Sequence, residues 1–337
     1  MVLEAILAQK RALVAARKAA LPEARLRAGL GRSDRDFGRA LRAGAPAFIL
    51  EVKPASPSEG HLRGEDELEP VIAAYGARAD VVSVLTDRPF FGGSFELLRR
   101  VRDRISQPVL CKDFIIDPYQ VYEARAHGAD AVLLMLSVLD DETYRRAAAA
   151  AGELAMGTLT EVHSAGEMAR AGALGAPVIG INNRNLATLD VDLDATPGLA
   201  PLAPPSALLI AESGIRSHKD VRRLRNSVDG FLVGTLLMRA ADPDRAVRRL
   251  VFGPTKVCGL TRPEDAAAAA RAGATHGGII FAPESPRAVT TARAVDLVRA
   301  APLAWVGVFA DQPADYVAQT AATLGLEAVQ LHGDESD

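Results

Sequence analysis

The chain has 337 residues, of which 49% are hydrophobic, and its 39 basic and 42 acidic side chains leave a formal net charge of −3. This composition supports a sizeable core and gives no basic footprint for nucleic acid. The longest uncharged run, residues 195–211, contains four prolines, so we expect no membrane-spanning helix. The two cysteines, Cys111 and Cys258, cannot form a disulfide framework, which favours a reducing cytoplasm.

Residues 1–45 have the pattern of a charged, amphipathic helical extension. Beyond them, apolar runs of strand length alternate with segments of helical period. The runs occupy residues 45–53, 75–85, 107–113, 126–136, 152–162, 173–181, 206–213 and 225–234. Continuous apolar strands are buried on both faces, which is typical of a parallel sheet. Eight such units predict an α/β fold with a TIM (β/α)8 barrel that follows the N-terminal helical extension.

Polar residues stand where each predicted strand ends. The set comprises Glu51, Lys53, Thr86, Lys112, Ser137, Glu161, Asn182, Arg184, Glu212, Ser213, Gly234 and Thr235. The carboxyl ends of barrel strands meet at one mouth, so such a set predicts a catalytic site. The loops after the seventh and eighth strands, "AESGI" and "FLVGTLLM", also place Ser213, Gly214, Gly234 and Thr235 where barrel enzymes bind phosphate. We therefore expect a phosphorylated small-molecule substrate.

Eight ordered motifs carry a resemblance to a known family: "EVKPASPSEG", "SVLTD", "FFGGSFELL", "CKDFII", "LTEVH", "GINNRNL", "AESGI" and "FLVGTLLM". Over residues 1–250 the chain resembles indole-3-glycerol phosphate synthase, and the corresponding domain is expected to span residues 1–252. That family is a carboxy-lyase of tryptophan biosynthesis. It closes the ring of 1-(2-carboxyphenylamino)-1-deoxyribulose 5-phosphate with loss of CO2 and water, and it uses no metal or organic cofactor.

The resemblance assigns roles to residues of this chain. It implies a catalytic set of Glu51, Lys53, Lys112, Glu161, Asn182 and Ser213. It implies substrate binding by Ser56, Phe91, Phe114, Leu133, Arg184, Leu186 and Leu232. Lys112 is the expected acid for ring closure, Glu161 and Glu51 the base and the orienting carboxylate, and Lys53 a second acid or a carboxylate partner. The family often has basic residues where this chain has Pro54 and Glu59.

A strand pattern restarts after residue 253, in "TKVCG", "GGIIF", "AWVGVF" and "EAVQLHGDE". These four units predict a partial (β/α)4 half of a second TIM barrel over residues 253–337. The motifs "KVCGLTRPEDA" and "GGIIFAPESPR" resemble phosphoribosylanthranilate isomerase, and the resemblance makes Cys258 the base and Arg287 the partner of the anthranilate carboxylate. Because the family's acid and phosphate site lie later in its barrel, we expect this second domain to be inactive in this chain.

Two other interpretations fit parts of the pattern. Another phosphate-binding TIM-barrel isomerase or aldolase would explain the loops after the last two strands, and Lys112 would then form a Schiff base. A non-catalytic scaffold would explain the incomplete second domain. Neither explains the acids and bases at the strand ends of residues 1–252 together. The sequence leaves the oligomeric state open.

Overall fold

The computed structural model describes residues 2–186 and 188–335. By its internal contacts the chain divides into two units, Met1–Asp244 and Arg245–Asp337. The division falls in the helix α13 (Pro243–Phe252). The domain boundary that the sequence predicts, between residues 252 and 253, marks where one family resemblance ends and the other begins. It stays a prediction.

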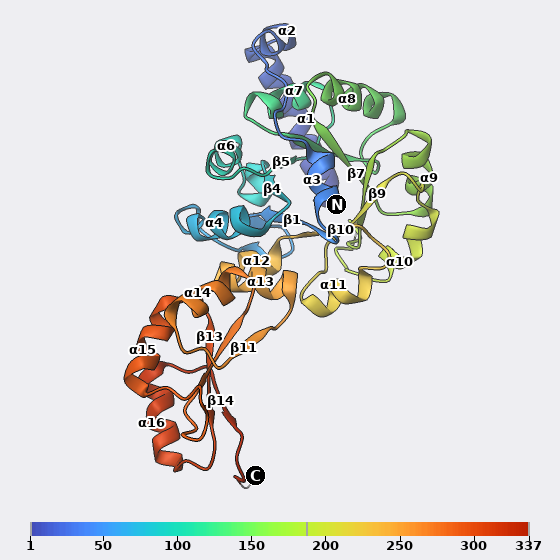
Figure 1. Cartoon of the computed structure of the whole chain (residues 1–337). Coiled ribbons are helices and arrows are strands. Elements are labelled where there is room, and N and C mark those ends of the chain that lie inside the picture. Colours follow the sequence, from blue (N-terminus) through green and yellow to red (C-terminus); the bar gives the residue numbers. More distant parts are fainter. Residues whose placement is uncertain (1, 187, 336–337) are drawn as a thin grey trace. The chain divides into compact units, whose positions relative to one another are not determined.

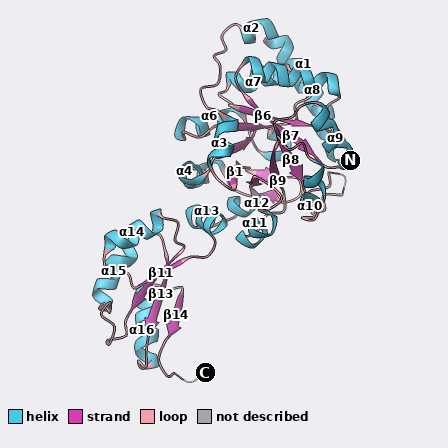
Figure 2. Cartoon of the chain, turned by 45° about the vertical axis from the view of Figure 1, so that its right-hand side comes forward, coloured by secondary structure: helices cyan, strands magenta, loops and turns pink. Residues whose placement is uncertain are grey.

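The first unit is a closed barrel of eight parallel strands (Figures 1 and 2). In chain order the strands are β1 (Ala47–Val52), β4 (Val81–Leu85), β5 (Val109–Lys112), β6 (Ala131–Met135), β7 (Gly157–Val162), β8 (Val178–Asn182), β9 (Leu208–Glu212) and β10 (Gly230–Val233). Each strand pairs with the next along the chain, and β10 pairs with β1 to close the ring. All eight strands are almost wholly buried, as their continuous apolar sequences predict.

Helices surround this barrel (Figure 2). They are α4 (Glu69–Arg78), α5 (Arg88–Phe91), α6 (Phe95–Arg104), α7 (Tyr119–Ala126), α8 (Asp141–Glu153), α9 (Ala165–Ala173), α10 (Ala195–Leu199), α11 (His218–Leu224) and α12 (Thr235–Met238). Short polar residues start several of them. The side chains of Ser94, Asp140 and Ser164 each accept a backbone N–H from the first turn of the helix that follows.

The N-terminal extension forms three helices, α1 (Val2–Ala20), α2 (Glu23–Arg27) and α3 (Phe37–Ala43). From α3, Phe37 and Leu41 join the cluster of buried residues inside the barrel, beside the first residues of the strands. The ring of Phe37 occupies the space that a side chain at Gly157 would need. The helix α3 therefore closes the amino-terminal end of the barrel, opposite the end at which the predicted site residues lie.

A buried ion triad joins α1 to the barrel. Lys10 of α1 lies 2.8 Å from a carboxylate oxygen of Asp87 and 2.6 Å from one of Asp113, and all three side chains are almost fully buried. The two carboxylates hold the pKa of Lys10 above its usual value, although burial alone would lower that pKa. Asp113 also accepts a hydrogen bond from Thr86 and directly follows Lys112. The triad thus fixes the extension to the loops that leave β4 and β5.

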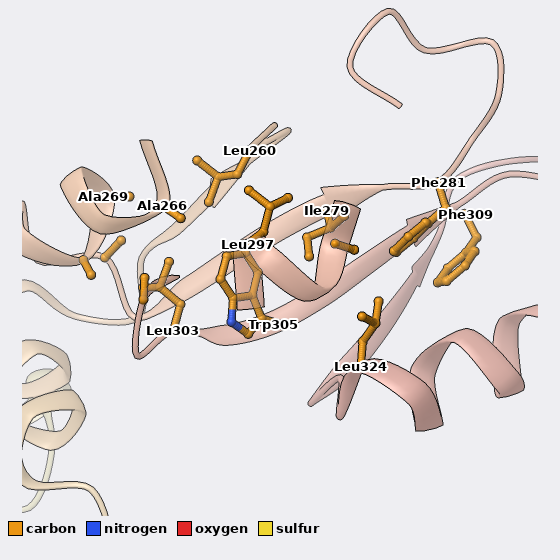
Figure 3. Packing of buried hydrophobic residues seen from close by; sticks show 14 residues of the cluster. Leu260, Ala266, Ala269, Ile279, Phe281, Leu297, Leu303, Trp305, Phe309 and Leu324 are labelled. Carbon is orange, nitrogen blue, oxygen red and sulfur yellow. The ribbon is translucent and has the colours of Figure 1, made fainter. Parts of the chain in front are cut away.

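The second unit contains a parallel sheet with the order β11 (Lys256–Cys258), β12 (His276–Ile280), β13 (Ala304–Phe309) and β14 (Ala328–Leu331). The helices α14 (Pro263–Arg271), α15 (Thr291–Ala300) and α16 (Ala314–Leu324) connect these strands. Leu297 of α15 and Leu324 of α16 pack with Trp305, Phe281 and other sheet residues in one core (Figure 3). The predicted fold, a complete TIM barrel followed by a partial one, is confirmed.

The ion triad generates a prediction about stability. Replacing Lys10 by Met leaves two buried carboxylates without their cation, which costs about 3–5 kcal/mol in proteins generally. We expect Lys10→Met to lower the urea midpoint of the far-ultraviolet circular dichroism transition of the first unit. The fluorescence of Trp305, the single tryptophan, reports on the unfolding of the second unit, and the urea midpoint of that transition should be unchanged.

The matched control is Lys18→Met. Lys18 is a half-exposed lysine on the same helix as Lys10, and its Nζ lies 2.8 Å from a carboxylate oxygen of Asp117. Such pairs contribute at most about 1 kcal/mol. An equal decrease in the free energy of unfolding in the two variants would show that the buried triad stabilises the fold no more than an exposed ion pair does.

Candidate active site

A cavity of about 540 Å³ opens at the carboxyl ends of the barrel strands. Every residue that the family resemblance places in the first domain's site lines it, as do the predicted phosphate-binding residues. These residues are Glu51, Lys53, Ser56, Phe91, Lys112, Phe114, Leu133, Glu161, Asn182, Arg184, Leu186, Ser213, Gly214, Leu232, Gly234 and Thr235. The structure therefore brings together residues that lie up to 184 positions apart in the chain. Their individual roles stay predictions. Thr86 and Ser137 of the strand-end set do not line the cavity: Thr86 is buried and donates a hydrogen bond to Asp113, and Ser137 is exposed.

Lys112 is the central cation of the cavity. Its Nζ lies 3.4 Å from a carboxylate oxygen of Glu161 and 3.4 Å from one of Glu212, and its side chain is 15% exposed. Burial alone would lower the pKa of Lys112, but Glu212, Glu161 and Glu51 outweigh burial and hold the pKa above its usual value. Lys112 is therefore an ammonium group at neutral pH, with a proton available to a ligand in the cavity.

Glu161 is held as a carboxylate by its neighbours. Burial raises its pKa, but Lys112, His163 and Asn182 favour the charged form more strongly and bring the pKa below its usual value. Asn182 donates a hydrogen bond from Nδ2 to Oε1 of Glu161 at 3.1 Å. Glu161 can therefore accept a proton in the neutral pH range.

Glu212 is a site residue that the sequence prediction left out of its catalytic set, although it ends a strand as Glu161 does. It lines the cavity, and its Oε2 faces Lys112. Burial, together with the nearby Glu161 and Glu51, raises the pKa of Glu212 despite the opposing effect of Lys112. Gly180 makes room for this carboxyl, because a Cβ at Gly180 would lie 1.9 Å from Oε1 of Glu212.

Glu51 and Lys53 form a second acid–base pair at the end of β1. The Nζ of Lys53 lies 3.2 Å from Oε1 of Glu51. The two residues are separated by one position in an extended segment, so their side chains leave the backbone on the same side. A Cβ at Gly234 would lie 2.5 Å from Oε1 of Glu51, which is why a glycine at the end of β10 suits this site.

An apolar wall faces these charges. The rings of Phe91 and Phe114 lie 5.9 Å apart between centroids, a distance typical of a packed aromatic pair. Leu133, Leu186 and Leu232 contribute further apolar lining. Two residues of the N-terminal helix, Leu3 and Ile6, also line the cavity, and the sequence prediction did not include them. A flat aromatic group fits this lining.

The loop after β9 has a backbone suited to approach by an anion. Ser213 has φ of 65° and Gly214 has φ of 82°, so two successive residues lie in the left-handed region. For a serine this conformation costs about 1–3 kcal/mol, and such residues cluster at functional sites. A Cβ at Gly214 would lie 2.4 Å from Val191, so a glycine is required. Gly234 and Thr235 line the same cavity after β10.

His163 lies behind Glu161, outside the predicted set. Its Nε2 is 3.3 Å from Oε1 of Glu161 and its Nδ1 is 3.5 Å from Oε2 of Glu167, although neither nitrogen is aligned for a hydrogen bond. Burial would lower the pKa of His163, but the two carboxylates raise that pKa to about 10. His163 is therefore a fixed cation beside the predicted base.

In the second unit the structure brings Cys258 and Arg287 together. Cys258 ends β11 and is exposed, and Nη1 of Arg287 donates to the backbone carbonyl of Cys258 at 3.1 Å. Gly278 on the neighbouring strand leaves space for the sulfur, because a Cβ there would lie 2.7 Å from it. No helix within the two described ranges has the length and apolar character that a membrane crossing requires.

Comparison with protein families identifies two domains. The model for indole-3-glycerol phosphate synthase matches residues 3–250, and the model for N-(5'phosphoribosyl)anthranilate (PRA) isomerase matches residues 255–337. The "Tryptophan biosynthesis protein TrpCF" of Vibrio cholerae serotype O1 is 52% identical over 319 residues, which cover 95% of this chain and 68% of that protein. The TrpCF protein of Yersinia pestis is 50% identical over 334 residues, covering 99% and 70% respectively.

These matches correct one expectation. We expected the second domain to be inactive, and that expectation rested on where the sequence ends. Both relatives align through the region that the isomerase model matches and carry one name over both domains. The comparisons therefore favour an active isomerase domain.

Among solved structures, 3-hexulose-6-phosphate synthase from Salmonella typhimurium matches with a TM-score of 0.50 and 17% identity, over 60% of this chain and 96% of that chain. At this identity the match concerns the fold alone. The sequence resemblance to both families is confirmed. With a family model over residues 3–250 and relatives at 50% identity or more along nearly its whole length, the chain belongs to the indole-3-glycerol phosphate synthase family of carboxy-lyases in tryptophan biosynthesis, joined to a phosphoribosylanthranilate isomerase domain.

Proposed function

We propose that the first unit converts 1-(2-carboxyphenylamino)-1-deoxyribulose 5-phosphate to indole-3-glycerol phosphate in the barrel cavity. The observation that carries this proposal is the position of Lys112, a buried ammonium between Glu161 and Glu212, in the cavity that the Phe91–Phe114 pair also lines. The reaction needs an acid beside a ketone, a base for a later proton, and a flat apolar surface for the aromatic ring.

Ring closure is the first step. The aromatic carbon that carries the carboxylate attacks the ketone carbon, and the ketone oxygen becomes a hydroxyl. Lys112 supplies the proton because its carboxylate neighbours keep it charged. The carboxylate then leaves as CO2, and its bonding electrons restore the aromatic ring. Arg184 offers a planar fork to the carboxylate before it leaves.

Dehydration completes the indole. The new hydroxyl leaves as water after Lys53 donates a proton, with Glu51 as the carboxylate that orients Lys53. Glu161 removes one proton from the carbon next to nitrogen, which forms the second double bond of the five-membered ring. Two protons are supplied and one is removed. One proton per turnover therefore comes from solvent, which matches the loss of a carboxylate as neutral CO2.

Substrate position follows from the two sides of the cavity. Phe91, Phe114, Leu133, Leu186 and Leu232 bind the aromatic ring, and Ser56 and Asn182 contact polar groups of the substrate. The phosphate lies against Ser213, Gly214, Gly234 and Thr235, where backbone N–H groups are accessible because glycines carry no side chain. This arrangement spans the substrate from ring to phosphate.

We further propose that the second unit supplies phosphoribosylanthranilate isomerase activity, with Cys258 as the base and Arg287 as the partner of the anthranilate carboxylate. The hydrogen bond from Arg287 to the carbonyl of Cys258 supports this pairing. The product of that reaction is the substrate of the first unit. The free cysteines Cys111 and Cys258 support a location in the reducing cytoplasm.

Removal of the acid or the base tests the synthase proposal. We expect Lys112→Ala and Glu161→Gln each to reduce synthase turnover by at least about 100-fold, the usual contribution of general acid–base catalysis. Turnover is followed by indole fluorescence, and circular dichroism checks that the barrel still folds. Lys219→Ala, which changes an exposed lysine of α11, is the control and should keep full turnover. Near-normal turnover in either of the first two variants would refute the assigned roles.

His163 generates a prediction about pH. The protonated imidazole lowers the pKa of Glu161, so its replacement in His163→Gln should raise that pKa. A base with a higher pKa loses its charge at a higher pH as the solution is acidified. We therefore expect the acidic limb of the kcat/KM profile to move to higher pH. His276→Gln, in the second unit, is the control, and an unmoved limb in His163→Gln would contradict the electrostatic role.

Cys258 is tested by substitution as well. We expect Cys258→Ala to abolish consumption of phosphoribosylanthranilate while synthase turnover is unchanged, because the base of one domain is absent from the cavity of the other. The control is Cys111→Ala, since Cys111 is buried and its thiol pKa is raised mainly by burial. Isomerase activity retained without the Cys258 thiol would exclude it as the base.

A further inference from the structure

An ion pair spans the rim of the barrel cavity. Nη2 of Arg239 lies 2.6 Å from Oε2 of Glu59. Glu59 belongs to the turn between the short strands β2 (Ala55–Ser56) and β3 (Gly60–His61), and Arg239 directly follows α12. Both residues line the cavity that Ser213, Gly214, Gly234 and Thr235 also line. The mechanism proposed above uses neither of them.

The helix α12 directs Arg239 toward the proposed phosphate position. Arg239 is four residues after Thr235, and its backbone N–H donates to the carbonyl of Thr235 at 3.2 Å. Side chains at positions i and i+4 of a helix lie on the same face and lean toward its N-terminus. The guanidinium is therefore carried toward the end of α12 at which Gly234 and Thr235 border the cavity.

The pair is weak enough to be exchanged. The side chain of Arg239 is 55% exposed and that of Glu59 is 24% exposed. Ion pairs this exposed contribute about 0.2–1 kcal/mol to stability. A phosphate dianion has more charge than a carboxylate and forms strong paired hydrogen bonds with a guanidinium. Phosphate in the cavity can therefore replace Glu59 as the partner of Arg239.

A second contact holds the segment of Glu59 in place during such an exchange. Arg63 donates from Nε to the carbonyl of Met238 at 2.9 Å and from Nη2 to the carbonyl of Ala240. These two carbonyls lie on either side of Arg239. The backbone N–H groups of Leu62 and Arg63 also donate to the carbonyl of Pro54, at 2.8 and 3.2 Å. Glu59 can thus release Arg239 while its own segment stays fastened to the end of α12.

We propose that Arg239 is a further phosphate-binding residue and that Glu59 is its internal competitor, which the substrate phosphate displaces. The inference rests on the phosphate position in the proposed function. Competition with Glu59 makes the site selective for phosphate. A singly charged carboxylate binds Arg239 no better than Glu59 does, whereas a phosphate dianion binds it more strongly. This competition also explains an acidic residue at the phosphate side of the cavity, because Glu59 balances the charge of Arg239 when no phosphate is bound.

The test measures the dissociation constant of inorganic phosphate by calorimetry, its inhibition constant against the synthase reaction, and the KM of the substrate. Removing the competitor in Glu59→Gln should tighten phosphate binding and lower KM by about two- to fivefold, the factor that an exposed ion pair represents. Removing the cation in Arg239→Gln should weaken both by about tenfold, as for a lost hydrogen bond to a charged group. Both effects should fall mainly on KM.

The double variant separates competition from a general charge effect. When Glu59→Gln is added to Arg239→Gln, none of the three constants should change further, because Glu59 then has no guanidinium for which to compete with phosphate. Glu65→Gln, which removes an acidic charge from the same connecting segment, is the matched control and should leave all three constants unchanged. Equal effects of Glu59→Gln and Glu65→Gln, or a persistent effect of Glu59→Gln without Arg239, would overturn the proposal.

The outcomes also distinguish this proposal from the proposed function. Calorimetry with phosphate needs no turnover, so it reports on Arg239 and Glu59 in any case. Absence of synthase turnover in the well-folded wild-type protein would sink the proposed function. Normal turnover together with phosphate affinities that are insensitive to both residues would sink the exchange of Glu59 for phosphate alone.

Discussion

The burial of Lys112 between carboxylates is the interaction on which the first unit depends. A lone ammonium in the interior would lose its proton, and lone carboxylates there would gain one. Lys112 and Glu161 hold each other in the charged form, whereas the pKa of Glu212 is raised, and the result is an acid and a base side by side at one pH. The barrel makes this possible because the alternate strands β5, β7 and β9 direct these three side chains into the same end of the ring, where residues of α1 and the apolar wall also line the cavity.

Much of this site follows from the sequence. Continuous apolar strands predict the parallel barrel, and the barrel in turn predicts that residues such as Glu51, Lys112 and Glu161 converge, since carboxyl ends of strands share one edge. Contacts between long-range partners do not follow in the same way. Lys10 has the sequence context of a surface helix, yet it is buried against Asp87 and Asp113. Nothing local distinguishes it from Lys18, because the difference lies in which face of α1 meets the barrel.

Glu212 and Glu59 illustrate two other limits. The sequence shows that Glu212 stands at a strand end. Its importance to the site comes from its short distance to Lys112, and only the closed barrel defines that distance. Glu59 is read from the sequence as a departure from the family pattern, and its partner Arg239 is 180 residues away. In the second unit, Cys258 ends β11 and Arg287 lies in the loop after β12, where it donates a hydrogen bond to the Cys258 carbonyl. The comparisons favour an active isomerase domain, contrary to the expectation drawn from the sequence.

Gly180 has a consequence for how such enzymes can vary. The Glu212 carboxyl occupies the space that a side chain at Gly180 would need, so a substitution at one of these positions affects the other. A mutation to alanine at position 180 would require the Glu212 carboxyl to move from its place beside Lys112. Laboratory evolution of this barrel toward other reactions can therefore displace the acid at position 212 without changing residue 212 itself.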